Sequence, residues 1–144
     1  MTKEEFEKMV ADEWEHAVPE KFRSKIKNVA FLVEGDPSFE VRTKEGLGPN
    51  QTLLGYYQGI PHTARGDWYG VGSTMPDTIT LYQNPIEQEA VEQEHSDILK
   101  NIRISREEYV RTAIRDTIWH EVAHHFGMDE DAVRTRERKR NKSR

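Results

Sequence analysis

Apolar residues recur at helical spacing in three long stretches of the chain. The first covers about residues 2 to 17 and opens with a capping box at Thr2, whose hydroxyl can accept a hydrogen bond from the first turn. The second covers about residues 84 to 102, and the third runs from a capping box at Ser105 to residue 126. We therefore predict three main helices, of which the last is the longest at roughly 31 Å. Shorter helical turns are predicted after Pro19 and Ser38.

Three shorter stretches have the composition of β-strands. Residues 29–33 form a continuous apolar run, which is typical of a strand in the middle of a sheet. Residues 53–61 are rich in aliphatic and aromatic side chains, and Gly55 marks either a bulge or a close backbone approach. In residues 78–82 apolar and polar residues alternate, which predicts a half-buried strand. With no internal repeat and no linker, residues 1–132 are predicted to form a single α+β domain.

The composition is that of a polar, globular chain without cysteine. Of its 144 residues, 35% are hydrophobic and 33% are charged, which is enough apolar character for one small core. There is no apolar run long enough for a membrane span, and the acidic start lacks the pattern of a secretory signal, so we expect a cytoplasmic protein. Because cysteine is absent, a bound metal would need imidazole and carboxylate ligands, the set typical of catalytic sites.

Charge is distributed unevenly along the chain. The net charge is −5, but residues 133–144 hold seven Lys and Arg against Glu137, a local +6, so residues 1–132 carry −11. We interpret residues 133–144 as a basic, mobile tail that follows the domain. The tail lacks the aromatic side chains that stack on bases, and nucleic acid is therefore not the expected partner.

The last predicted helix leads into the sequence HEVAHHFGMDE, residues 120–130. This segment contains HExxH, in which residues four apart lie on one face of the helix, so His120 and His124 can bind one metal ion. Glu121 lies one residue round from that face, where its carboxylate can reach a metal-bound water and act as a base. The spacing therefore predicts two metal ligands and a catalytic residue.

The residues after the motif offer a third metal ligand. Gly127 can adopt the left-handed conformation that ends a helix and turns the chain back toward the histidines. The spacing of related motifs puts the third ligand at Glu130, with Asp129 or Asp131 as alternatives. By contrast, His125 faces about 100° away from its neighbour on the helix and is expected to pack or hydrogen-bond instead of binding the metal.

Four segments resemble the compact bacterial zincin-like metallopeptidases called minimal zincins: residues 34–38 (EGDPS), 53–61 (LLGYYQGIP), 76–87 (PDTITLYQNPIE) and 120–130. The resemblance implies an α+β, zincin-like fold in which a small mixed sheet packs on helices and a long C-terminal helix carries the active site. It also implies one zinc ion bound by the two motif histidines and an acidic residue. The family's motif usually has Asp at the third-ligand position, where this chain has Glu130.

These features predict a zinc-dependent metallopeptidase that acts on a peptide or protein substrate. Glu121 would take a proton from the metal-bound water as it attacks the peptide carbonyl, and pass it to the leaving amine. Tyr57, His62 and Tyr82 are candidates for binding the substrate or stabilising the oxyanion. In zincins the substrate commonly lies along an edge strand, so residues 78–82 are expected to pair with its main chain.

Two alternatives are left open by the sequence. The same site could belong to a metal hydrolase with another substrate, such as RNA. The chain could also be a metal-stabilised regulatory or interaction domain in which the site is weak or vestigial. Imidazole and carboxylate ligands accept divalent metals other than zinc as well. The sequence does not define an oligomeric state.

Overall fold

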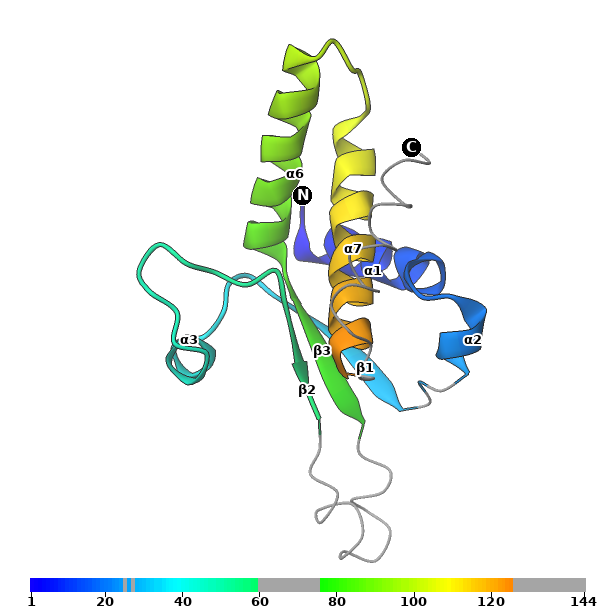
Figure 1. The fold of residues 1–144 in the computed structure, drawn as a ribbon, viewed down its shortest axis with the longest axis vertical. Coiled ribbons are helices and arrows are strands. Elements are labelled where there is room, and N and C mark those ends of the chain that lie inside the picture. The colour runs from blue at the N-terminus through cyan, green and yellow to red at the C-terminus, as the bar shows by residue number, and fades with distance from the viewer. Residues whose placement is uncertain (25, 27, 60–75, 126–144) are drawn as a thin grey trace, which may run out of the picture.

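Five helices and three strands make up the part of the chain that the computed structural model describes, residues 1–24, 26, 28–59 and 76–125. Figure 1 shows a small sheet with helices around it, the α+β architecture that the sequence predicts. The helices are α1 (Lys3–Ala17), α2 (Glu20–Arg23), α3 (Phe39–Lys44), α6 (Gln83–Leu99) and α7 (Arg106–His125). The strands are β1 (Val29–Glu34), β2 (Gly55–Gln58) and β3 (Asp77–Tyr82).

Side-chain caps define the starts of three helices, as the sequence predicts. The backbone N–H of Glu5 donates to Thr2 Oγ1 at 3.1 Å at the start of α1. Ser38 caps α3 and Ser105 caps α7 in the same way, each with a hydroxyl that accepts from a backbone N–H at 3.2 Å. Such caps satisfy N–H groups that have no partner within the helix.

Within the described residues, no helix combines the length and apolar character needed to cross a bilayer.

The strand order is β1-β3-β2, with β1 parallel and β2 antiparallel to β3. Two predictions about the sheet are therefore wrong: residues 29–33 form an edge strand, and residues 78–82 form the central one. The apolar run of β1 was misleading because Leu32 is 45% exposed on the outer face. The polar Thr80 is only 8% exposed, because β3 is flanked by a strand on each side.

The core lies between the sheet and α7. Ile79 and Leu81 of β3, together with Ile114 and Ile118 of α7, are fully buried in one apolar cluster. Figure 1 shows that α6 leads away from the sheet and α7 returns to it, so the two helices form an antiparallel pair. The C-terminal turn of α7 consequently lies beside the strands.

An ion-pair network joins α1 to α7. Glu13 is 5% exposed, and its carboxylate accepts hydrogen bonds from Arg115 at 2.9 Å and Arg111 at 3.5 Å. A buried carboxylate is tolerated only when it is paired and hydrogen-bonded, which both arginines provide. The network therefore fixes the first helix against the helix that carries the HExxH motif.

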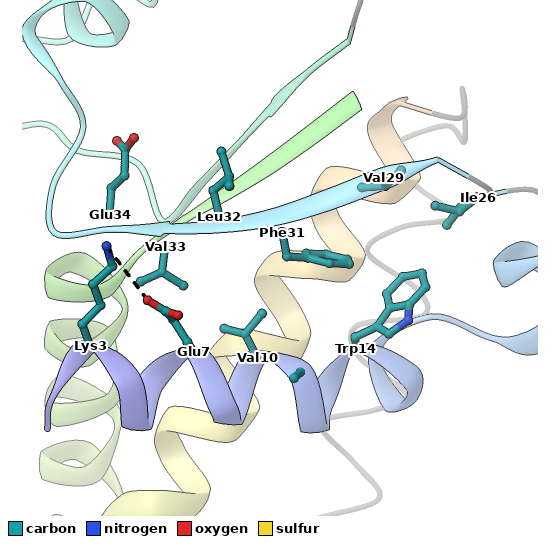
Figure 2. Close-up of a pocket in the computed structure, with 11 residues that line it drawn as sticks. Lys3, Glu7, Val10, Trp14, Ile26, Val29, Phe31, Leu32, Val33 and Glu34 are labelled. Atoms are coloured by element: carbon teal, nitrogen blue, oxygen red, sulfur yellow. Dashed lines mark ion pairs between the residues drawn. The ribbon is translucent and has the colours of Figure 1, made fainter. Parts of the chain in front are cut away.

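A groove of about 680 Å³ lies between α1 and the edge strand β1 (Figure 2). Trp14 of α1 and Phe31 of β1 face each other in it, with ring centroids 5.0 Å apart. Lys3 and Glu7 form an ion pair of 3.9 Å on its rim. None of the residues that line this groove belongs to the HExxH motif, so it is separate from the predicted site.

Candidate metal and catalytic site

His120 and His124 lie on one exposed face of α7, in its last two turns. Their ring centroids are 4.4 Å apart and the ring planes are inclined by 66°. This is the arrangement that four-residue spacing on a helix predicts, with one imidazole above the other. Two nitrogen donors can thus approach the same point in space from a rigid element.

The side chain of Glu121, a residue of α7, lies against the edge strand β2. This side chain is half-buried, and its carboxylate interacts with the main chain of Tyr57. Burial raises the pKa of the Glu121 carboxyl above its usual value, whereas His120 and the Tyr57 main chain act in the opposite direction. The carboxylate is therefore held at the strand, beside the two imidazoles.

Gly55 allows β2 to approach α7 closely enough for this contact. A Cβ atom at position 55 would lie 2.7 Å from Thr117 Cγ2 and 3.3 Å from the Thr80 carbonyl oxygen. Thr117 cannot turn away freely, because its hydroxyl donates to the Ala113 carbonyl at 2.7 Å. The close approach predicted for Gly55 is confirmed, and Glu121 Cγ lies 3.5 Å from the same Cβ position.

The main chain of β2 faces in two directions. The Tyr82 N–H donates to the Leu54 carbonyl at 2.9 Å, and hydrogen-bonded pairs alternate along an antiparallel ladder. Tyr56 and Gln58 therefore direct their main-chain groups toward β3, and Gly55 and Tyr57 direct theirs toward the outer edge. The interaction of Glu121 with the Tyr57 main chain agrees with this alternation, and Glu121 Cγ lies 3.5 Å from the Cβ position of the neighbouring Gly55.

Tyr57, Asp77 and His125 form a cluster next to the motif. The Tyr57 hydroxyl donates to Asp77 Oδ2 at 2.8 Å, and the Tyr57 ring stacks on His125 with centroids 3.7 Å apart. His125 Nε2 lies 3.7 Å from the same Asp77 oxygen. His125 is packed, as its position on the helix predicts. Asp77 was not identified from the sequence, where it reads only as a turn residue before a strand.

The remaining sequence-predicted residues do not join this group in the described structure. Tyr82, at the end of β3, is 1% exposed, and burial followed by the charge of Glu34 raises its pKa to about 12. The charge of Glu121 contributes to the same rise in pKa, but the side chain itself is buried in the sheet. His62 and the candidate third ligands, Glu130, Asp129 and Asp131, lie outside the described residues.

The donors fit a metal ion of the zinc type in their chemistry. Two imidazoles on one helix face, with a carboxylate close by, are the ligands and the base that zinc hydrolases combine. Within the described residues, no group of three or more His, Asp or Glu side chains is arranged to hold a metal ion. The described site therefore supplies two candidate ligands, and the predicted third belongs to residues beyond its range.

Comparison with known proteins identifies the class to which this fold and site belong. A family model of zincin-like metallopeptidases matches residues 26–140, most of the chain, and the protein belongs to that family. The match begins before β1 and extends past the HExxH motif, so it includes the sheet and α7. A search of curated proteins gives no significant match. Membership in this family confirms the resemblance to zincin-like metallopeptidases and the zincin-like fold expected from the sequence.

Proposed function

We propose that the protein is a zinc-dependent peptidase whose active site lies at the C-terminal end of α7. One observation carries the proposal: two imidazoles converge on the exposed face of the helix, with Glu121 held beside them at the edge of β2. A family of metallopeptidases supplies the class of reaction. The arrangement supports hydrolysis over a purely structural metal, because it places a carboxylate beside two imidazoles, the base and the ligands that zinc hydrolases combine.

His120 and His124 are the proposed zinc ligands contributed by α7. The third is an acidic residue after Gly127, with Glu130 as the first candidate and Asp129 or Asp131 as alternatives. When bound, zinc would supply Lewis acidity to polarise the peptide carbonyl and to acidify water. The chain's contribution is to fix the two imidazoles on a long helix whose opposite face is buried from Tyr109 to Ala123.

Glu121 is the proposed catalytic base and acid. It would accept the proton of the attacking water and deliver it to the nitrogen of the leaving amine. The contact with the Tyr57 main chain supports this role, because it holds the carboxylate to one side of His120 and His124, where it can act without binding the metal.

We propose the outer edge of β2 as the surface that pairs with the substrate main chain. Gly55 directs its N–H and carbonyl groups to this edge, and an extended peptide can add to such an edge as a further strand. This edge replaces residues 78–82, which are already paired on both sides. A peptide bound there would lie next to Glu121.

The three side chains expected to contact substrate receive different roles. We assign the Tyr57 side chain a positioning role, because its hydroxyl and its ring are engaged with Asp77 and His125. Tyr82 is buried, and we assign it a structural role in the sheet instead of a contact with the substrate. His62 stays a candidate for stabilising the oxyanion.

The test is the Glu121→Gln variant of the zinc-loaded protein. Cleavage of a complex peptide mixture, read by mass spectrometry, is expected to fall by about 10²- to 10⁴-fold, the usual effect of losing a general base. Zinc content should stay at the wild-type level. Glu107→Gln is the matched control, because Glu107 is an exposed residue at the start of the same helix. Unchanged cleavage in Glu121→Gln would contradict the proposal.

A further inference from the structure

A cavity of about 390 Å³ adjoins the proposed catalytic residues. It lies between α7, α6 and the segment that leads into β2, and its lining includes both His120 and Glu121. On α7 the lining residues extend from Glu121 back to Ala113, which is about 12 Å at 1.5 Å per residue. A substrate side chain can therefore enter this cavity while the main chain stays at the catalytic group.

The walls of the cavity are apolar near the strand. Leu53 and Leu54 line it from the segment before β2, and Ala113 lines it from α7. Both leucines are half-buried, so the cavity offers them further contact with an aliphatic chain. Apolar walls of this kind suit the methylene stem of a long side chain.

Two acidic residues from different helices line the same cavity. They are Glu89 of α6, which is exposed, and Asp116 of α7, which is half-buried and one turn before His120. A second cavity of about 670 Å³ also contains both residues and continues between the helices toward Ile104, so the carboxylates lie where the two spaces meet. Among the described residues, neither Lys nor Arg lines the first cavity, and Glu89 forms no ion pair.

We propose that this cavity is a specificity subsite for a basic side chain, so that the enzyme cleaves next to Lys or Arg. The aliphatic part of that side chain would pack on Leu53, Leu54 and Ala113, and its cationic end would meet Glu89 and Asp116. The inference rests on the proposed peptidase function, because it assigns the cavity to the substrate of that site. It names the class of substrate, a peptide with a basic residue at one fixed position from the scissile bond.

The first test is a cleavage profile of the zinc-loaded, full-length protein on a proteome-derived peptide mixture. Lys and Arg are expected to be enriched about tenfold at one position relative to the cleaved bond, the effect of one charge-assisted hydrogen bond. Glu89→Gln combined with Asp116→Asn should remove the enrichment while cleavage beside uncharged aliphatic residues continues. Glu92→Gln is the matched control on α6, because Glu92 accepts from Gln88 and does not line the cavity.

Charge reversal gives a sharper outcome. Glu89→Lys combined with Asp116→Asn should shift the preference at that position from basic to acidic residues, which a nonspecific loss of stability does not do. Cleavage by the wild type without a basic preference, or a preference that the double variant retains, would overturn the subsite and leave the peptidase function standing.

A binding measurement separates the subsite from the reaction. N-acetyl-lysine methylamide should shift the amide NMR signals of Ala113 and Thr117, and N-acetyl-norleucine methylamide should shift them about tenfold more weakly at equal concentration. If the wild type cleaves no peptide, the proposed function is contradicted, whereas this titration still tests whether the cavity binds a basic side chain. Equal shifts with the two compounds, or none with either, would refute the proposed subsite.

Discussion

The ring of Tyr57 stacks on the ring of His125, with centroids 3.7 Å apart and planes inclined by only 13°. Tyr57 belongs to the edge strand β2, and His125 is the last residue of α7, directly after the candidate ligand His124. The Tyr57 hydroxyl also donates to Asp77 at the start of β3. One side chain therefore connects the central strand, the edge strand and the end of the helix that carries the site.

Substitutions at Tyr57 should separate the contributions of its hydroxyl and its ring. Tyr57→Phe removes the hydrogen bond to Asp77 and is expected to cost about 1 kcal/mol of unfolding free energy. Tyr57→Leu also removes the stack on His125, which should cost a further 0.5 to 1.5 kcal/mol, roughly, of unfolding free energy. Urea unfolding measures both, and equal losses in the two variants would mean that the stack contributes nothing.

Gly55 is predicted to be replaceable only if Thr117 is shortened. Gly55→Ala brings a methyl group to 2.7 Å from Thr117 Cγ2 and should destabilise the protein by about 1 to 3 kcal/mol through overpacking. Thr117→Ser removes that methyl group and keeps the hydroxyl that donates to Ala113. The double variant should recover part of the loss in thermal unfolding, and simple additivity of the two substitutions would contradict this contact.

Glu13 is expected to be among the most sensitive positions outside the site. Glu13→Ala leaves Arg111 and Arg115 without their shared carboxylate between α1 and α7, and the loss should be about 3 kcal/mol. Glu7→Gln on the exposed part of α1 serves as the comparison and should change stability little. Comparable unfolding midpoints for the Glu13 and Glu7 variants would show that the network does not fix α1.

Tyr82 should make the protein sensitive to alkaline pH. Its pKa is raised to about 12 in the folded state, chiefly by burial, whereas an unfolded tyrosine ionises near its ordinary value of about 10. Its contribution to stability is therefore complete below the unfolded pKa and is lost as the pH rises through the folded one. Urea midpoints measured from neutral pH upward should fall more steeply for the wild type than for Tyr82→Phe. Parallel curves would contradict the buried position of the hydroxyl.

The helices and the candidate ligands follow directly from local sequence. Thr2, Ser38 and Ser105 cap the helices that they were expected to start, and four-residue spacing brings His120 and His124 together. These features depend on neighbours within one turn, which is why a sequence without an alignment predicts them.

The order of the strands could not be predicted in the same way. The exposure of Leu32 and the burial of Thr80 depend on which strand lies in the middle of the sheet, a long-range property that hydrophobic pattern alone does not encode. For the same reason the contact between Glu121 and the Tyr57 main chain was not foreseen, since it joins residues 64 positions apart through backbone atoms. Only the glycine at position 55 indicated that two elements meet there.

The most direct test of a metal centre on α7 is the zinc content of three histidine variants. Elemental analysis after saturation with zinc and removal of the free ion should find one ion per chain in the wild type. His16→Ala, which changes an exposed histidine on α1, should retain the ion, whereas His120→Ala and His124→Ala should each lose it. Full zinc occupancy in both of the latter variants would contradict the assignment of His120 and His124 as ligands, and with it the proposed catalytic site.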